Sequence, residues 1–264
     1  MPSSHYPRLV WVFLRLNILN ELQYRTNFWL QMLRSLVGLG TALAGLGVVF
    51  AQTDDLGGWG RDELLALVGV YFIVGGLVNL VLVPSLSRFV QDIQQGTLDY
   101  LLTKPEDAQV LVSIRQVEVW RCIDLGLGIA IVGIALVRLG DRVGPGQVAG
   151  FGITLVAGVT IIYAFLLILV TTAFWVVRVD NILYVFQGMY EAGRWPVGIY
   201  PPWMRATLTF VVPIAFAITI PASGLVGRLS LPTLLGAVAL AVVLLALSRW
   251  FWTRGVRRYA GASA

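Results

Sequence analysis

The sequence predicts an all-α integral membrane protein with six membrane-spanning helices. Of its 264 residues, 58% are hydrophobic and only 12% are charged. A soluble domain carries about 25% charged residues, so this chain lacks the polar surface that a soluble globule needs. Its apolar residues form long uninterrupted stretches of the length that crosses a bilayer as a helix. The alternating pattern of outer-membrane β-barrel strands is absent from the sequence.

The rarest residue types exclude several kinds of functional site. The chain has one cysteine, Cys122, and one histidine, His5, which rules out an intrachain disulfide, a multi-histidine metal site and a histidine-dependent triad. Its single lysine, Lys104, does not follow the glycine-rich turn of a P-loop. We therefore expect no catalytic residue, no metal site and no cofactor bound by this chain. The isoelectric point of about 9.7 reflects membrane orientation, and we expect no binding to nucleic acid.

The N-terminal third of the chain predicts an interfacial helix and two spans. Residues 1–29 mix apolar and charged side chains and lack a signal-peptide cleavage site. This mixture favours an amphipathic helix in the headgroup region, the alternative being the polar start of the first span. The predicted spans are 30–51, which is rich in small residues that let helices pack closely, and 64–86, in which Pro84 is expected to break the helix.

The third, fourth and last spans are predicted at 120–139, 148–177 and 231–251. The fourth is long enough to require a tilt or a kink. The last ends in a basic tail.

The segment between the fourth and last spans leaves two topologies open. In the first, 178–205 is a cytoplasmic loop and 206–222 is the fifth span. In the second, 181–200 is the fifth span and 203–225 is a proline-broken re-entrant helix pair on the outer side. Both place most Lys and Arg residues on the side of the two termini, so the positive-inside rule predicts that both termini are cytoplasmic.

The polar segment after the second span carries the most informative local signals. Gly96 is expected to end a helix in a left-handed conformation, and Thr97 to cap a short new helix. Thr103 to Glu106 reads as a capping box, with Pro105 near the start of the next helix. The apolar residues from Leu98 to Leu102 would form an exposed patch that meets a partner, unless the segment is a solvated loop.

This segment and its position resemble the permease subunits of type-two, exporter-type ABC transporters. The family pattern of Gly-Thr-Leu-Asp/Glu, then Leu, then Pro is matched here by Gly96, Thr97, Leu98, Asp99, Leu102 and Pro105. The stretches RWPVGIYPPWMR, FVVPIAF and SGLVG resemble the family's tail and would place 203–225 as re-entrant helices. Glu191 and Arg194 depart from the family, which is usually apolar at the outer end of the fifth span.

The resemblance implies that residues 1–264 form one transmembrane permease domain in which 87–106 holds the coupling helix. That helix would dock on an ATP-binding cassette subunit, which would carry ATP and Mg²⁺. The residues expected to contact that subunit are Asp92, Gln95, Gly96, Thr97, Leu98, Asp99, Tyr100, Leu101 and Lys104. Further expected partners are a second permease chain, identical or a sister, and membrane lipids. The expected location is the bacterial inner membrane.

A second candidate site lies at the base of the third span. Charged residues follow one another at intervals of three, namely Arg115, Glu118, Arg121 and Asp124. Residues three apart on a helix can pair, which favours a ladder of structural ion pairs. A gate or a proton relay is the alternative, because ionisable groups within the membrane are often functional.

These observations favour the membrane subunit of an ATP-driven exporter of hydrophobic or amphipathic molecules. The predicted spans hold few central charges, which argues against a route for ions or strongly polar solutes. The alternative is a gradient-driven secondary transporter or channel, which would need ionisable residues at the membrane midplane and inverted repeats. A membrane enzyme is less favoured, because clustered Asp, His or Lys residues are lacking.

Overall fold

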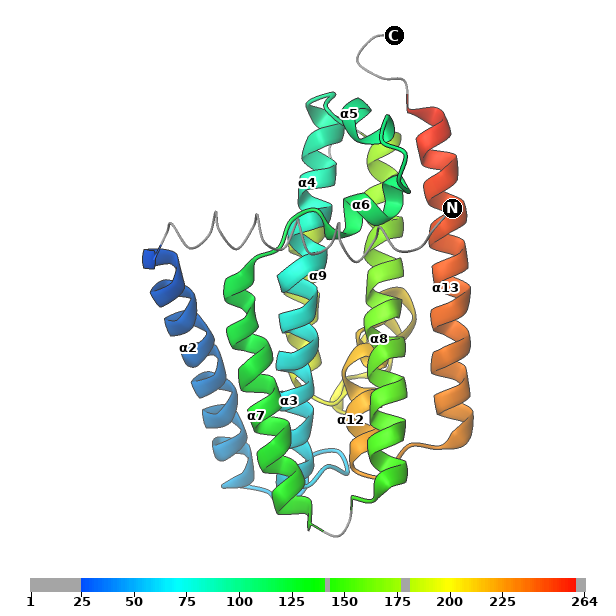
Figure 1. Cartoon of the computed structure of the whole chain (residues 1–264). Coiled ribbons are helices and arrows are strands. Elements are labelled where there is room, and N and C mark those ends of the chain that lie inside the picture. Colours follow the sequence, from blue (N-terminus) through cyan, green and yellow to red (C-terminus); the bar gives the residue numbers. More distant parts are fainter. Residues whose placement is uncertain (1–24, 141–142, 177–180, 260–264) are drawn as a thin grey trace.

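A computed structural model describes residues 25–140, 143–176 and 181–259 (Figure 1). Within these ranges the protein is built from helices, and no β-strand is present. The described residues thus agree with the predicted all-α class. The predicted interfacial helix, 1–29, falls almost entirely outside them.

Five helical segments of the described chain are long and apolar enough to cross a membrane. They are α2 (Arg25–Phe50), α3 continuing through η1 into α4 (Arg61–Leu77, Val78–Leu82, Val83–Gln94), η2 with α7 (Val119–Arg121, Cys122–Leu139), α8 with η4 (Pro145–Thr171, Thr172–Phe174), and α13 (Leu231–Arg258). The chain is therefore a multi-pass membrane protein. In Figure 1 these segments run roughly side by side, with α3 and α8 in the middle of the bundle.

Local chemistry explains where several of these helices begin. The Glu63 carboxylate accepts a hydrogen bond from the Gly60 backbone N–H (2.9 Å) at the start of α3. The Gln147 side chain accepts one from the Gly144 backbone N–H (2.9 Å) at the start of α8. The Ser230 hydroxyl accepts one from the Thr233 backbone N–H (3.3 Å) at the start of α13. Each contact satisfies a backbone donor at a helix start that has no partner within the helix.

Pro84 does not break the second helix, contrary to the sequence-based expectation. The backbone widens into the π-helical turn η1 just before it, and α4 then continues to Gln94. Pro84 lacks the N–H that would bind the Leu80 carbonyl four residues earlier. That carbonyl instead accepts a hydrogen bond from the Glu118 backbone N–H (2.8 Å), so the helix stays continuous with no unpaired group at this point.

The closest helix contact in the bundle is the seam between α3 and α7. A methyl group added at Gly128 would lie 2.6 Å from the backbone nitrogen of Ile73, and one added at Gly69 would lie 2.9 Å from that of Val132. Glycine at these points lets the two backbones touch, as small residues do between membrane helices. By contrast, Gly126 on α7 has no neighbour within 4 Å, so of these two α7 glycines only Gly128 packs against α3.

The segment between α8 and α13 consists of short helices. They are α9 (Ile182–Tyr190), η5 (Glu191–Arg194), η6 (Val197–Ile199), α10 (Pro202–Ala206), η7 (Thr207–Val211), α11 (Ile214–Ala217) and α12 (Thr219–Leu225). The pair formed by Pro202–Val211 and Ile214–Leu225 is bent by 70°. The α-helical part of the predicted span 181–200 is thus nine residues long.

Both ends of the bent pair lie at the same end of the bundle. Ile199, just before the pair, packs against Gly57. Arg228, just after it, binds the Gly58 carbonyl and the Glu63 carboxylate (2.5 Å). At the opposite end, Phe174 and Trp252 stack with Phe89 (5.5 and 5.1 Å between ring centroids). A pair that starts and finishes at one end has the arrangement of a re-entrant loop, so we retain the second topology as our prediction.

Candidate functional site

Two regions of the structure could carry function, and the first is the segment that follows α4. The backbone of Gly96 is left-handed (φ +67°), which confirms the predicted helix end. The Thr97 backbone N–H then donates to the Asp92 carbonyl (2.9 Å), as in a Schellman closure. The chain turns into the short helix α5 (Asp99–Leu102), which Figure 1 places at the end of the bundle beside the end of α4.

Asp92 holds this segment together from the inside. Its side chain is only 2% exposed and pairs with Arg88 (3.2 Å) and with Arg115. It also accepts a hydrogen bond from the Thr97 hydroxyl (3.1 Å), so that hydroxyl is turned back toward α4 instead of capping α5. A carboxylate with this burial and these partners is positioned to fix the turn, and it does not face a partner protein.

Exposure divides the other predicted contact residues into three groups. Leu98 and Leu101 are buried within the chain, whereas Tyr100 between them is 79% exposed. Gln95 and Lys104 are also exposed, and Gly96, Thr97 and Asp99 are half-buried. The expectation that Leu98 and Leu101 anchor directly in a partner does not fit this arrangement, because both already pack in the hydrophobic core.

Asp107, and not Thr103, caps the helix that follows. Its carboxylate accepts a hydrogen bond from the Gln109 backbone N–H (2.9 Å) at the start of α6 (Ala108–Ile114). It also pairs with Arg249 on α13 (2.5 Å). The hydrogen bond from Arg249 lowers the pKa of the Asp107 carboxyl below its usual value. This contact joins the α5 region to the last long helix.

The four charged residues predicted as a ladder do not share one helix. The chain leaves the helical conformation after Ile114, because the Ser85 hydroxyl exchanges hydrogen bonds with the backbone of Gln116 (2.8 and 3.0 Å). Arg121 still pairs with Glu118 (3.3 Å) and with Asp124 (3.6 Å). Arg115 pairs with Asp92 on α4. The structure therefore brings these residues into ion pairs by way of a loop.

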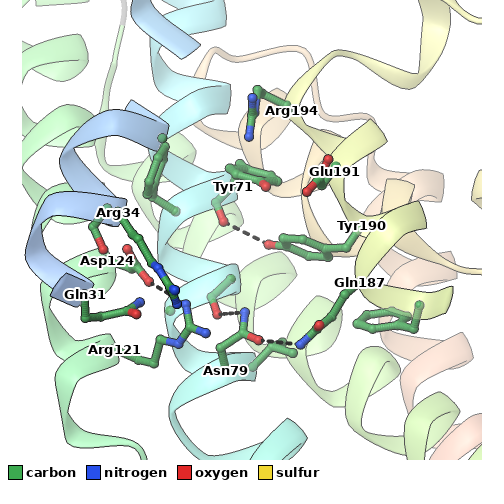
Figure 2. A pocket seen from close by; sticks show the side chains of 17 residues that line it. Gln31, Arg34, Tyr71, Asn79, Arg121, Asp124, Gln187, Tyr190, Glu191 and Arg194 are labelled. Atoms are coloured by element: carbon green, nitrogen blue, oxygen red, sulfur yellow. Dashed lines mark hydrogen bonds and ion pairs between the residues drawn. The ribbon is translucent and has the colours of Figure 1, made fainter. Parts of the chain in front are cut away.

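The second region is a cavity of about 350 Å³, here called the polar pocket. Its lining comes from α2, from the α3–η1 helix, from the start of α7 and from α9 with η5. The lining side chains that carry polar atoms are Gln31, Arg34, Ser35, Tyr71, Asn79, Arg121, Asp124, Gln187, Tyr190, Glu191 and Arg194. In Figure 2 Tyr71, Tyr190, Glu191 and Arg194 gather at one end, and Gln31, Arg34, Arg121 and Asp124 gather at the other.

Hydrogen bonds fix the wall between α3 and α9. The Tyr190 hydroxyl donates to the Tyr71 carbonyl (2.8 Å). The Gln187 side chain donates to the Asn79 side chain (3.2 Å), which itself donates to the Gly75 carbonyl (2.9 Å). Asn79 thus links α9 to the α3–η1 helix and also lines the cavity (Figure 2).

Arg194 stands out among the charged residues of the pocket. Its guanidinium lies over the Tyr71 ring, 5.4 Å from the centroid. Its Nε atom is buried and has no hydrogen-bond acceptor among the described residues. Buried donors in proteins are almost always paired, so this Nε–H group is able to donate to an oxygen of a bound molecule.

Five charged residues that the sequence places in separate predicted spans thus share this cavity, namely Arg34, Arg121, Asp124, Glu191 and Arg194. Charges from separate stretches of the sequence meet in one cavity because α9 passes into the 3₁₀ turn η5. Gln187, Tyr190, Glu191 and Arg194 follow the i, i+3, i+4, i+7 spacing of one helix face. That spacing was a signal that could have identified the wall of the pocket.

The described residues contain no group of three or more His, Cys, Asp or Glu side chains that could hold a metal ion.

Comparison with known proteins gives one finding. A family model described as "ABC-2 family transporter protein" matches residues 36–263, which is most of the chain. No curated protein and no solved structure matches.

Proposed function

The chain belongs to the ABC-2 family of transporter proteins, and from this premise we propose that it is the membrane subunit of an ATP-driven exporter. ATP hydrolysis, with its Mg²⁺, would take place on a separate ATP-binding cassette subunit, because this sequence has no P-loop. We place the complex in the bacterial inner membrane with both termini of this chain in the cytoplasm, in keeping with its distribution of Lys and Arg.

The exposure of Tyr100 is the observation that carries this proposal. An aromatic ring that is 79% exposed projects from α5, while the two leucines that flank it are buried. Exposed aromatic residues of this kind are frequent centres of protein interfaces. We infer that Tyr100, with Gln95 and Lys104, contacts the ATP-binding subunit. Asp92, Leu98 and Leu101 would hold α5 in position for that contact.

A continuous helix connects this contact to the polar pocket. The segment Arg61–Gln94 has no break and, at 1.5 Å per residue, is about 50 Å long. Its α3 and η1 portions line the pocket, and its α4 end leads into α5. Closure of the ATP-binding subunits would push α5 and tilt this helix, which changes the shape of the pocket. The pocket would then form part of the export route.

We also propose that a second permease chain, identical or a sister, completes the complex. The long helix α2 leaves large apolar side chains exposed, among them Trp29, Leu33 and Val37. Membrane lipids or the second chain would cover this face.

The test is co-purification with the ATP-binding subunit from native membranes. A tagged chain should capture a subunit that gives the eluate ATPase activity, and the double variant Tyr100→Ala/Lys104→Ala should lose most of it. Tyr184→Ala is the matched control, because Tyr184 is 72% exposed on α9, away from α5. Full transport by the purified chain alone would refute the proposal.

A gradient-driven transporter or channel is the second candidate, and the charges of the polar pocket favour it. Such proteins place ionisable side chains in cavities within the membrane. Liposomes that contain only this chain separate the two functions. Uptake driven by a proton gradient without nucleotide would support the second candidate, whereas the exporter requires the ATP-binding subunit and ATP.

A further inference from the structure

The charged residues that line the polar pocket do not balance one another. Three are arginines (Arg34, Arg121 and Arg194) and two are carboxylates (Asp124 and Glu191), so the lining carries one excess positive charge. Glu118, which lies outside the lining, pairs with Arg121 and offsets that charge only at the Arg121 end of the cavity. Among the described residues, Arg34, Glu191 and Arg194 form no ion pair.

The buried N–H donor without an acceptor belongs to Arg194, one of the arginines that give the lining its excess positive charge. Arg194 has five N–H groups in a planar fork, and its Nε is buried without an acceptor. The guanidinium lies over the face of the Tyr71 ring. A ring face has no lone pair that could accept a hydrogen bond in the plane of the guanidinium. An oxygen of a bound molecule in that plane would satisfy Nε. A planar fork of this kind matches the two oxygens of a carboxylate or phosphate.

The depth of the pocket limits what can carry that oxygen. Tyr71 lies ten residues after Arg61, where α3 begins, which is about 15 Å along a helix that crosses a hydrocarbon layer of about 30 Å. We therefore expect a molecule bound there to lie within the hydrocarbon layer, below the headgroups. Phe72, Val78 and Phe186 also line the cavity, so its lining has apolar as well as charged parts. An occupant with both parts is amphipathic.

We propose that the polar pocket binds the anionic head, a carboxylate or a phosphate, of an amphipathic molecule. Arg194 is its counter-ion, Arg34 at the other end of the cavity (Figure 2) adds only longer-range attraction, and the apolar lining receives the start of the hydrocarbon chain. This assignment rests on the proposed function in so far as the bound molecule is the cargo.

Binding to the purified chain tests the assignment without the ATP-binding subunit. Isothermal titration calorimetry in a nonionic maltoside detergent would compare dodecyl phosphate and laurate with dodecyltrimethylammonium, which has the same tail and a cationic head. We expect both anions to bind and the cation to bind at least tenfold more weakly. Tighter binding of the cation would overturn the proposal and would indicate that the carboxylates of the pocket bind a cationic head.

Four variants locate the binding. Arg194→Gln should weaken the affinity for dodecyl phosphate at least tenfold, and Arg34→Gln about threefold. Arg254→Gln is the matched control and should change nothing, because Arg254 lies over Trp250 on α13, outside the pocket. Glu191→Gln removes the uncompensated carboxylate and should strengthen binding about threefold, a gain that a misfolded protein cannot give. Unchanged affinity in both Arg194→Gln and Glu191→Gln would refute the site.

The source of the anion is decided in the complex. Stimulation of the co-purified ATPase by dodecyl phosphate in neutral-lipid nanodiscs identifies the site with cargo. Binding that is displaced by anionic phospholipid and leaves the ATPase unchanged identifies it with a bilayer lipid, which also satisfies the charge assignment. If the ATP-binding subunit is captured but no anionic amphiphile binds, the proposed function stands and this inference fails.

Discussion

The two faces of α3 serve opposite purposes. One face forms the seam with α7, where Gly69 and Gly128 bring the backbones so close that even a methyl group has no room. The other face carries Tyr71 and Asn79 and borders a cavity of about 350 Å³. Packing of the first kind resists movement, because any added volume must separate two backbones. The second kind relies on a few hydrogen bonds and leaves space for a ligand.

One helix, α3, is thus held firmly on one face and is free to move on the other. The seam ties α3 to α7 as a unit, so a push on α4 is expected to move the pair together. The wall toward α9 consists of the Tyr190–Tyr71 and Gln187–Asn79 contacts, and interhelical hydrogen bonds in membranes average only about 0.6 kcal/mol. That wall is where we expect the pocket to open and close.

The largest expected effect comes from adding volume to the seam. Gly128→Val should destabilise the protein by roughly 1–3 kcal/mol, the range for an overpacked core. Gly126→Val is the matched control, because it adds the same volume two residues away where no atom lies within 4 Å. Thermal unfolding in detergent measures both. If the two variants unfold at the same temperature, α3 and α7 do not form the close seam described here.

A smaller effect is expected from the pocket wall. Tyr190→Phe removes the hydroxyl that binds the Tyr71 carbonyl and keeps the ring, so we expect a loss of about 0.6 kcal/mol, the average for an interhelical hydrogen bond in a membrane. Tyr184→Phe, on the exposed face of the same helix, should cost nothing measurable. Denaturation curves for both variants make the comparison. An equal loss in the two would mean that the hydroxyl contact does not hold the wall.

The smallest effect is expected from the Asp107–Arg249 ion pair. Because this pair is reached by solvent, its contribution to stability is a reference for the contributions of the two faces of α3. The Arg249 hydrogen bond lowers the pKa of Asp107, so this pair stabilises the folded protein above the usual carboxyl pKa, near 3.8. The contribution is lost as the pH falls through the lower folded-state pKa. Solvent reaches both side chains, so we expect the low end of the roughly 0.2–1 kcal/mol of exposed pairs.

Asp107→Asn is the variant for this test, because asparagine can still cap α6 but cannot form the ion pair. Between pH 6 and pH 3 the wild-type melting temperature should fall slightly more than that of the variant. Asp54→Asn, which changes an exposed aspartate in the loop before α3, should follow the wild type. A variant curve parallel to the wild type would show that the Asp107–Arg249 pair contributes nothing.

Local features were predictable from the residues that cause them. Gly96 ends its helix as expected, because a left-handed residue after a helix is usually glycine. The predictions made for Thr103 and Pro84 were wrong, because contacts with other residues decide the structure at both positions. Asp107 competes with Thr103 for the cap and gains Arg249 as a second partner. The Leu80 carbonyl that Pro84 leaves free finds the Glu118 N–H far along the chain. Neither partner is visible in the neighbouring sequence.

The sequence by itself determined that this is a multi-pass helical membrane protein, because the length of its apolar stretches and its scarce charge can be read without any tertiary contact. Its resemblance to the transporter family rested on the short motif from Gly96 to Pro105. The sequence also located the segment that turns at Gly96 and presents Tyr100. Only the tertiary structure decided that Asp92, Leu98 and Leu101 face inward and that charges from α2, η2, α7 and η5 share one cavity. The physical reason is that burial and charge compensation depend on contacts between helices, and a periodic sequence fixes which side chains share a face but not which helix that face meets.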